Sequence, residues 1–364
     1  MRVVISSAGR RVYLVQWFQQ ALIEAGISGD VYVLDHDPHA AAAAAADGFR
    51  QMPRFTSEAY VAQLLATVDE LKPDLFISLN DYELTALSHG LSTDLEARGV
   101  IVPVLNAAAH QAVADKLHMF RVLSDAGIST PTTVLLSDAS AVNDMLETFP
   151  TVVLKDRWGS GSSGLQRLSS QDARHWLALE RAAGSNRRGP QHQDELIMQP
   201  DLGGSEYGLD IVTPVRGGAV AGVLARRKLG MRHGETSAAM TVPSEQFEDL
   251  ATSLAATLSI RGTVDVDVMV PDGGEPQVID INPRFGGGYP FTHIAGADVP
   301  HFLVTSTLGL APQPGWNTYR HGYLGAKHEG IIGFETAGRD EQRGPLLPAS
   351  AHFSTTPTVP SKAG

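Results

Sequence analysis

The most regular alternation of apolar and polar positions lies in the segment 262–288. Val264–Val270 alternates apolar and acidic residues, and Gln277–Asn282 alternates in the same way after a turn rich in Pro, Asp and Gly. A period of two residues is typical of a half-buried strand, and such turn residues connect strands. The pattern therefore predicts a β-hairpin centred on Gly273-Gly274.

In this register, Asp267 lies opposite Asp280, and Asp265 lies opposite Asn282. Residues two apart in a strand point to the same side, so we expect all four side chains on one face. Clustered carboxylates repel one another unless a cation lies among them, and Mg²⁺ prefers oxygen ligands. The pattern favours a magnesium site, and an acidic hairpin that simply faces water is the alternative.

Fixed cations lie close to this hairpin in the sequence. Arg284 is the next residue but one after Asn282 and is suited to bidentate contact with a phosphate or a carboxylate. A strand predicted for Ala219–Lys228 ends in three adjacent cations, which are ordinarily a solvated edge. Arg226 and Lys228 are expected on one face of that strand, and Arg227 on the other.

The first hundred residues alternate between strand-like and helix-like stretches. Short apolar runs at Arg2–Ser6, Val31–Asp35 and Leu75–Leu79 predict strands, the amphipathic run Val12–Ala25 predicts a helix, and the alanine-rich stretch 40–46 fits a helix. Strands separated by helices imply a doubly wound parallel sheet with ligands at the carboxyl ends of its strands.

The ends of these strands carry polar residues. The first loop contains a single glycine, Gly9, so the dinucleotide-binding fingerprint is missing and we reject that interpretation. Contact with a small molecule and ordinary capping of helices are equally good interpretations of the polar strand ends. These residues are Ser6, Ser7, Asp35, Asn80, Asp81 and Glu83.

The middle of the chain contains a loop suited to phosphate. A helix is expected from Asn106 to about Ser124, carrying Asp115-Lys116, and a strand is expected at Thr151–Lys155. The segment 156–164 follows, with three glycines and three serines, and its backbone N–H groups are free to bind phosphate. Flexible hairpin tips have the same composition, which is the simpler alternative.

Composition and charge limit the classes of function that the chain can have. At 364 residues, two or three domains are expected, and 43% hydrophobic residues indicate a folded soluble protein. A net charge of −12 disfavours binding to nucleic acid or to anionic membranes. The chain contains no cysteine, which excludes disulfides and thiolate chemistry, and no apolar run of about 18 residues. Without a signal-peptide pattern, a cytoplasmic enzyme is expected.

Together, these segments resemble the ATP-grasp superfamily over about residues 1–310. They are most similar to its branch of carbamoyl phosphate synthetase large-subunit-like ligases and the pyrrolysine-biosynthesis ligase. Lys116, Lys155 and the loop match the positions that contact nucleotide phosphates, and the segment 198–202 resembles the hinge that reads adenine. The resemblance implies that ATP is bound by Lys116, Lys155, Gly159, Ser160, Gly161, Ser162, Ser163, Gly164, Gln199, Pro200, Asp201, Leu202 and Glu206, the last on the ribose.

The resemblance also implies the metal ligands and the fold. Asp267, Asp280 and Asn282 match the magnesium ligands, with Mn²⁺ as the alternative metal, although Asp280 stands where relatives usually carry the longer Glu. Gln199 stands where many relatives carry a charged residue. The fold implied is α/β, becoming α+β in the ATP-grasp part. It divides into an N-terminal domain (1–105), an ATP-grasp domain (106–310) with a mobile lid (125–195), and an extension (311–364) whose last part (344–364) is expected to be disordered.

The implied activity is ATP-dependent ligation of a carboxylate to an amine, through an acyl phosphate and with release of ADP. Arg284, Lys228 and Arg226 are the implied catalytic cations. His233 and His293 are candidate general bases, and Glu235 a candidate ammonium contact, although ordinary loop residues explain each one more simply. Carboxy-phosphate chemistry on bicarbonate and an ATP-binding regulatory subunit are the alternatives. Small-molecule substrates and, by analogy with relatives, a homodimer are expected.

Overall fold

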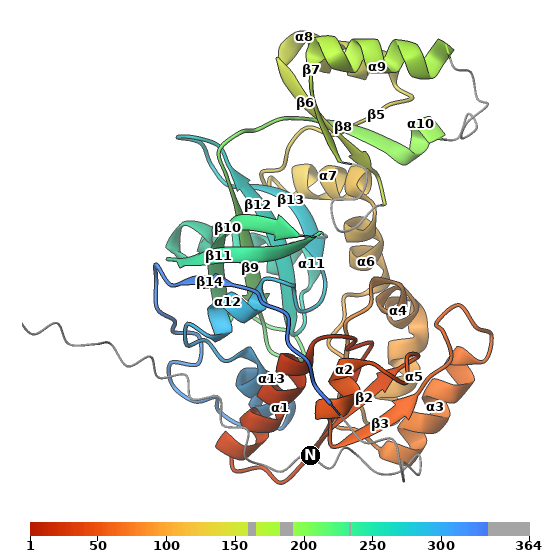
Figure 1. The fold of residues 1–364 in the computed structure, drawn as a ribbon, viewed down its shortest axis with the longest axis vertical. Coiled ribbons are helices and arrows are strands. Elements are labelled where there is room, and N and C mark those ends of the chain that lie inside the picture. The colour runs from red at the N-terminus through yellow and green to blue at the C-terminus, as the bar shows by residue number, and fades with distance from the viewer. Residues whose placement is uncertain (159–164, 183–191, 233, 334–364) are drawn as a thin grey trace, which may run out of the picture.

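Three β-sheets organise the chain in the computed structural model, which describes residues 1–158, 165–182, 192–232 and 234–333. The N-terminal sheet and the largest sheet form the body of the molecule, and the third sheet projects from it (Figure 1). The expected combination of a parallel N-terminal sheet with antiparallel sheets in the rest of the chain is confirmed. Among the described residues, no helix is both long and apolar enough to cross a bilayer.

The N-terminal sheet is parallel throughout, in the strand order β3-β2-β1-β4. Apolar residues of β1 alternate between two cores, because Val3 packs with α1 on one side and Val4 packs with α3 on the other. This doubly covered sheet places the carboxyl ends of its four strands at one edge. The elements are β1 (Arg2–Ser6), α1 (Val12–Glu24), β2 (Asp30–Asp35), α2 (Ala41–Ala45), β3 (Gly48–Gln51), α3 (Tyr60–Leu71), β4 (Leu75–Ser78), α4 (Asp81–Ala86), η1 (Leu87–Leu91) and α5 (Ser92–Glu96).

The helix expected from Asn106 to Ser124 is two helices, α6 (Ala107–Ala114) and α7 (Lys116–Asp125). The break occurs at Asp115, whose backbone is extended (φ −117°, ψ 108°). Its carboxylate caps α7 by accepting hydrogen bonds from the backbone N–H groups of the next turn. Good helix formers on both sides concealed this break in the sequence, because propensity carries no information about an internal cap.

The projecting sheet has the strand order β5-β8-β6-β7 and is antiparallel. Helices α8 and α9 bury their apolar side chains against it in a small separate core. Figure 1 shows these helices on the side of the sheet away from the rest of the molecule. The elements are β5 (Val134–Leu135), α8 (Ala139–Thr148), β6 (Thr151–Asp156), β7 (Gln166–Ser169), α9 (Ser170–Ala182), α10 (His192–Glu195) and β8 (Leu196–Pro200).

The largest sheet is antiparallel, in the order β13-β12-β9-β10-β11-β14. One face packs its apolar side chains against α11, and the opposite face carries Asp210, Asp265 and Asp267. The elements are β9 (Ser205–Val212), β10 (Gly222–Arg232), β11 (Glu235–Val242), η3 (Glu245–Phe247), α11 (Glu248–Leu258), β12 (Thr263–Val270), β13 (Gln277–Asn282), α12 (Tyr289–His293), α13 (Val299–Thr307) and β14 (Leu324–Ala326).

The predicted hairpin register is confirmed at its functional end. Asp265 pairs with Asn282, and Asp267 pairs with Asp280. The register then shifts, so that Val268 pairs with Val278 and Ile279 is an extra residue. Such a β-bulge bends a strand and changes the direction of its neighbouring groups.

The C-terminal part does not form a separate layer in the described residues. β14, from the expected extension, pairs with β11 at the edge of the largest sheet. α13, from the expected ATP-grasp part, shares a core with α1 of the N-terminal part. The domain boundaries drawn from the sequence therefore stay a prediction, and residues 344–364 lie outside the described residues.

Candidate functional site

The acidic face of the β12–β13 hairpin lies beside several lysines. Lys116 Nζ lies 3.3 Å from Asp280 Oδ1, and Lys228 Nζ lies 2.6 Å from Asp267 Oδ1. Lys228 also donates to Glu206 Oε1 at 2.8 Å. Residues from α7, β9, β10, β12 and β13 thus meet in one mixed-charge cluster, and their roles toward nucleotide and metal stay a prediction.

Lys155 extends this cluster from the projecting sheet. Its ammonium donates to the backbone oxygen of Ile279, the bulged residue, at 3.3 Å. Burial lowers the pKa of Lys155 to about 8, helped by nearby Lys116 and opposed by the carboxylate of Asp280. The group is therefore a cation that loses its proton more easily than an exposed lysine, and a phosphate placed beside it restores the charge.

Lys228 and Asp267 form a buried ion pair. Burial opposes the charge of Lys228, but the carboxylates of Asp267 and Glu206 raise its pKa. Burial also raises the pKa of Asp267 to about 7, against the attraction of Lys228. A metal ion placed beside Asp267 would act in the same direction as Lys228 and favour the charged carboxylate.

Arg226 takes a different position from Lys228. Its side chain is 1% exposed and binds two carboxylates, Asp210 and Asp265, the latter at 2.6 Å. A Cβ added at Gly288 would lie 2.1 Å from Arg226 Nε, and one at Gly208 would lie 3.0 Å away. Two glycines thus cover the guanidinium. The catalytic role expected for Arg226 is untested, and this burial favours a structural role, in which it neutralises two buried carboxylates.

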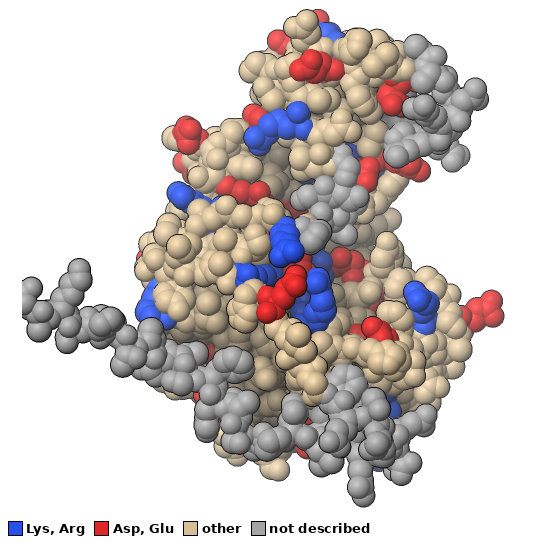
Figure 2. All heavy atoms as spheres, in the orientation of Figure 1, with Lys and Arg blue, Asp and Glu red and all other residues tan. Residues whose placement is uncertain are grey.

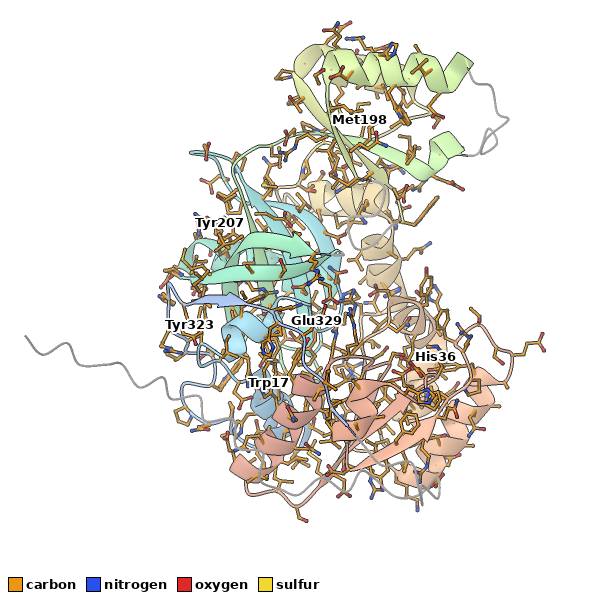
Figure 3. All side chains as sticks on the ribbon, in the orientation of Figure 1. Trp17, His36, Met198, Tyr207, Tyr323 and Glu329 are labelled. Atoms are coloured by element: carbon orange, nitrogen blue, oxygen red, sulfur yellow. The ribbon has the colours of Figure 1, made fainter. Side chains whose placement is uncertain are left out.

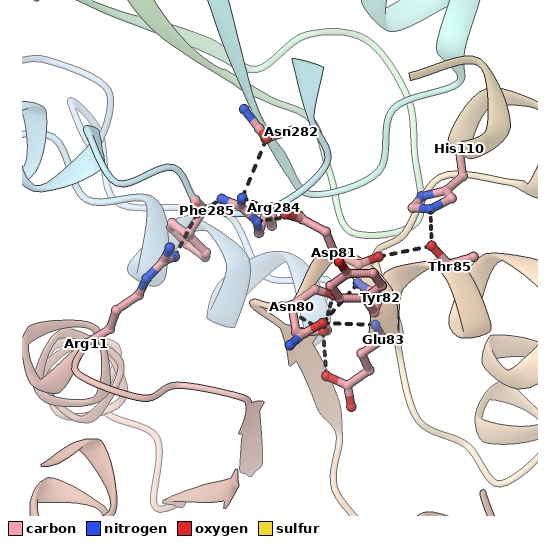
Figure 4. Close-up of polar contacts among 11 residues, drawn as sticks. Arg11, Asn80, Asp81, Tyr82, Glu83, Thr85, His110, Asn282, Arg284 and Phe285 are labelled. Atoms are coloured by element: carbon pink, nitrogen blue, oxygen red, sulfur yellow. Dashed lines mark hydrogen bonds and ion pairs between the residues drawn. The ribbon is translucent and has the colours of Figure 1, made fainter. Parts of the chain in front are cut away.

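Arg284 joins the hairpin to the N-terminal sheet. Its guanidinium donates to both carboxylate oxygens of Asp81, at 2.7 and 3.0 Å, and lies 3.5 Å from Asn282 Oδ1 (Figure 4). Nearby, Arg11 donates to the backbone oxygen of Phe285 at 2.8 Å. Asp81 stands at the carboxyl end of β4, where a doubly wound sheet binds its ligands.

Several polar strand ends named in the sequence analysis serve the N-terminal sheet itself. Glu83 is buried and accepts hydrogen bonds from Ser6 at 2.7 Å, from Ser78 at 2.6 Å and from Tyr60. Burial raises the pKa of Glu83, which favours its neutral form. Asn80 caps α4 through its side-chain oxygen. For Asn80 the capping interpretation is the better one, and Ser6 and Glu83 form a buried hydrogen-bonded group that joins the strand ends to α4.

The loop after β1 is strained and tied to β2. Ser7 has a positive φ of 58°, which is uncommon for a residue with a Cβ. Asp35 accepts hydrogen bonds from the backbone N–H groups of Gly9 and Asp37. The loop is thereby held at the sheet edge that faces Arg284.

The expected adenine hinge connects the projecting sheet to the largest sheet. Gln199 is buried and donates to Thr133 Oγ1 at 2.7 Å, so its side chain fixes the hinge rather than facing a ligand. Asp201 lies 3.0 Å from Arg167 and accepts from the N–H of Gly203. Pro200 is buried and Leu202 half-buried, so Glu206, exposed in part, is the hinge-side group most open to a ligand.

An ion pair that links α7 to the projecting sheet was not expected from the sequence. Arg157 forms a bidentate ion pair with Asp115, at 2.8 and 2.5 Å, and its backbone oxygen accepts from the N–H of Lys116. Lys116 and the end of β6 are thereby held together. Asp115 and Arg157 are 42 positions apart, and nothing in their local sequence indicates the pairing.

The three remaining candidates differ in position. His293 stacks on Trp17, with 3.7 Å between ring centroids, and burial lowers its pKa to about 3. Such a low pKa makes it a poor base near neutrality. Glu235 pairs with Lys327 at 3.1 Å, and despite burial this partner lowers its pKa. The loop Gly159–Gly164 and His233 lie outside the described residues.

The segment after β14 lies over the centre of the molecule. Besides Lys327, Glu329 approaches Arg232 to 3.7 Å, and Figure 3 places it where the N-terminal part meets the largest sheet. Figure 2 shows acidic and basic side chains gathered at this place. A Cβ added at Gly287 would lie 3.4 Å from Glu235 Cγ, so the Lys327–Glu235 pair lies close to the segment that follows Arg284.

The oxygen groups of the hairpin are also the best candidate for a metal. Asp267, Asp280 and Asn282 supply hard oxygen ligands on one face, which fits Mg²⁺. A second group, Glu24, Asp298 and His301, has its potential ligand atoms within 4.8 Å of one another. However, His301 Nε2 accepts from the N–H of Gln313, so a neutral ring carries its proton on Nδ1 and offers no lone pair.

Comparisons with known proteins agree with this geometry. A family model described as a PylC-like N-terminal domain matches residues 3–103, and one described as an ATP-grasp domain matches residues 113–288. None of the curated proteins matches the chain.

Solved structures similar to the chain share its fold across most of its length. They include N5-carboxyaminoimidazole synthetase from Staphylococcus aureus with ADP (14% identity, TM-score 0.63, 86% of this chain and 78% of that one). The biotin carboxylase domain of the Hydrogenobacter thermophilus 2-oxoglutarate carboxylase, a dimer with MgADP and bicarbonate, has 15% identity and a TM-score of 0.65 (88% and 72%). L-amino acid ligase from Bacillus licheniformis has 16% identity and a TM-score of 0.61 (88% and 77%).

Proposed function

Because the chain belongs to the ATP-grasp superfamily, we propose that it is an ATP-dependent carboxylate–amine ligase that works through an acyl phosphate and releases ADP and phosphate. The observation that supports this most is the meeting of Lys116, Lys155 and Lys228 with Asp267 and Asp280. Phosphoryl transfer asks a protein mainly to position its reactants and to neutralise charge, and this cluster offers both.

The residues divide by charge. Asp267, Asp280 and Asn282 would hold Mg²⁺, which supplies charge neutralisation to the transferred phosphoryl group when it is bound. Lys116 and Lys155 would leave their present acceptors and contact phosphate oxygens. Lys228 lies between Asp267 and Glu206 and would keep both carboxylates in place.

The acid substrate would lie on the side of the site that faces the N-terminal sheet. Arg284 offers its guanidinium there, oriented by Asp81. It would hold the substrate carboxylate, or stabilise the oxyanion when the amine attacks the acyl phosphate. The chain has no cysteine, and the reaction needs no nucleophile from the protein.

The alternative chemistry is carboxylation through carboxy-phosphate. Two of the similar structures are a carboxyaminoimidazole synthetase and a biotin carboxylase, and the second was solved with bicarbonate. A regulatory ATP-binding subunit is the remaining alternative, and the presence of both lysines and metal ligands disfavours it. A homodimer and a cytoplasmic location stay predictions from the sequence.

The test is release of ADP by the purified protein with Mg-ATP and pools of amino acids, small carboxylates and amines, with a bicarbonate arm. ADP formation that depends on one acid and one amine, with a new amide in the mass spectrum, supports the proposal. Dependence on bicarbonate alone favours carboxy-phosphate chemistry. Release of AMP instead of ADP would mean an acyl adenylate and contradict the mechanism.

A further inference from the structure

Two aromatic rings are stacked on each other at the surface, beside the substrate side of the site. Phe55, in the loop after β3, and Tyr82, in the first turn of α4, have ring centroids 5.0 Å apart and planes only 5° from parallel. Phe55 is 40% exposed and Tyr82 is 71% exposed. An offset parallel stack leaves one face of each ring without a partner.

This exposure is unusual for aromatic residues of this protein. Among the described residues, the remaining strongly exposed aromatic side chain is Trp158, and the guanidinium of Arg157 covers its ring at 4.5 Å. Burial of an apolar ring ordinarily stabilises a folded protein, so an aromatic pair that stays exposed calls for an explanation. Either the contact between the rings holds the loop before α3 in place, or the rings bind a planar ligand.

The position of Tyr82 favours binding. Tyr82 is the next residue after Asp81, and the carboxylate of Asp81 accepts two hydrogen bonds from Arg284 (Figure 4). Its ring is therefore carried by the residue adjacent to the Asp81–Arg284 pair, which is the proposed substrate-binding group. Asn80 accepts from the backbone N–H of Tyr82 at 2.9 Å, which fixes the start of α4.

The loop that carries Phe55 is already anchored without the aromatic stack. Tyr60, at the start of α3, donates to the buried Glu83 of α4. This hydrogen bond joins α3 to α4, so the two segments are connected without the rings. Preorganised aromatic groups lower the entropy cost of binding.

We propose that Tyr82 and Phe55 form a platform for a substrate with a planar aromatic ring, which stacks there while its charged group reaches Arg284 or Asp81. This inference rests on the proposed function, because it names the class of substrate that the ligase would take. It gives the N-terminal sheet a role in choosing the substrate, separate from the nucleotide cluster.

The test measures binding rather than turnover. Isothermal titration in the presence of Mg²⁺ and a non-hydrolysable ATP analogue would compare pairs of probes that share a charged group and carry either an aromatic or a saturated six-membered ring: benzoate with cyclohexanecarboxylate, phenylalanine with cyclohexylalanine, and benzylamine with cyclohexylmethylamine. The variants are Tyr82→Ala, Tyr82→Phe and Phe55→Ala. Ile23→Ala is the control, because Ile23 is also 71% exposed but lies near the end of α1.

At least one aromatic probe should bind the unaltered protein and Ile23→Ala about 2- to 10-fold more tightly than its saturated counterpart, the range expected for one aromatic stack. Tyr82→Phe should keep this preference, and Tyr82→Ala should lose it without a change in melting temperature.

Absence of binding or of preference in the unaltered protein, or a preference that survives in Tyr82→Ala, would overturn the inference. A lower melting temperature with unchanged preference would assign the rings to pinning the loop. Aromatic binding by a protein that releases AMP instead of ADP from Mg-ATP would instead contradict the proposed function and leave this inference standing.

Discussion

Asp81 and Arg284 are 203 positions apart in the sequence, yet the carboxylate of one accepts two hydrogen bonds from the guanidinium of the other. This ion pair links the carboxyl end of β4 to the segment after the β12–β13 hairpin, which is the proposed metal-binding element. The proposed substrate side of the site is thus built from two parts of the chain, and Asp81 orients Arg284.

We expect Asp81→Asn to lower kcat/KM for the acid substrate about 10- to 100-fold, because it removes a charge-assisted bidentate contact that orients Arg284. The affinity for ATP should not change. Steady-state ADP release at saturating ATP measures the first quantity, and titration of a non-hydrolysable ATP analogue measures the second. Asp69→Asn is the control, because Asp69 of α3 forms an exposed ion pair with Arg98, after α5, in the same N-terminal part. An unchanged kcat/KM in Asp81→Asn would show that the pair is dispensable.

Asp280→Ala should reduce ADP release by about 100-fold or more, since it removes a proposed metal ligand and the partner of Lys116. The fold should persist, because Asp280 is partly exposed at the open face of the hairpin. Asp272→Ala removes an exposed carboxylate from the tip of the same hairpin and should be neutral. Full activity in a folded Asp280→Ala protein would refute the metal assignment.

The part of the site that the sequence predicted best is the part with a regular period. Alternation along β12 and β13, with a glycine-rich turn between them, was enough to pair Asp267 with Asp280. The bulge at Ile279 was not predictable, because it depends on the contacts of the neighbouring strands. It is also what turns a backbone oxygen toward Lys155.

Contacts between distant segments were beyond sequence reasoning. Arg226 looked equivalent to Lys228 because both lie on one face of β10, yet Asp210 and two glycines enclose it. Asp115 looked like an interior helix residue, yet it caps α7 and binds Arg157. In each case the deciding partner is brought close by the tertiary fold, on which local pattern has no bearing.

Arg226→Met should lower the free energy of unfolding by about 3–5 kcal/mol, because it leaves two carboxylates, one of them fully buried, without their cation. Arg227→Met, at the next position of the same strand, should have little effect, since Arg227 is not buried. Urea denaturation followed by circular dichroism measures both. A stable Arg226→Met protein with lost activity would instead support the catalytic role expected from the sequence.

ATP affinity should fall with increasing pH above about 8, the pKa to which burial lowers Lys155. Phosphate stabilises the charged ammonium, so the complex holds the proton that the free protein begins to lose at that pH. The dissociation constant should be flat below pH 7 and rise up to about tenfold per pH unit above 8. Lys155→Arg, which stays charged, should flatten this dependence. Equal slopes in the two proteins would mean that another group titrates.

A divalent metal ion should bind this protein well only together with nucleotide. Lys116 lies against Asp280 and Lys228 lies against Asp267, so a cation must compete with two ammonium groups for its ligands. Phosphates of ATP would draw Lys116 away and free the carboxylate of Asp280. Titration of Mn²⁺ followed by electron paramagnetic resonance should therefore show affinity at least about tenfold higher with a non-hydrolysable ATP analogue than without it. Lys116→Gln should strengthen nucleotide-free Mn²⁺ binding and weaken binding of the analogue, which separates this competition from a general loss of the site. Tight, stoichiometric Mn²⁺ binding to the unaltered protein in the absence of nucleotide would show that Lys116 and Lys228 do not compete with the metal ion for the carboxylates.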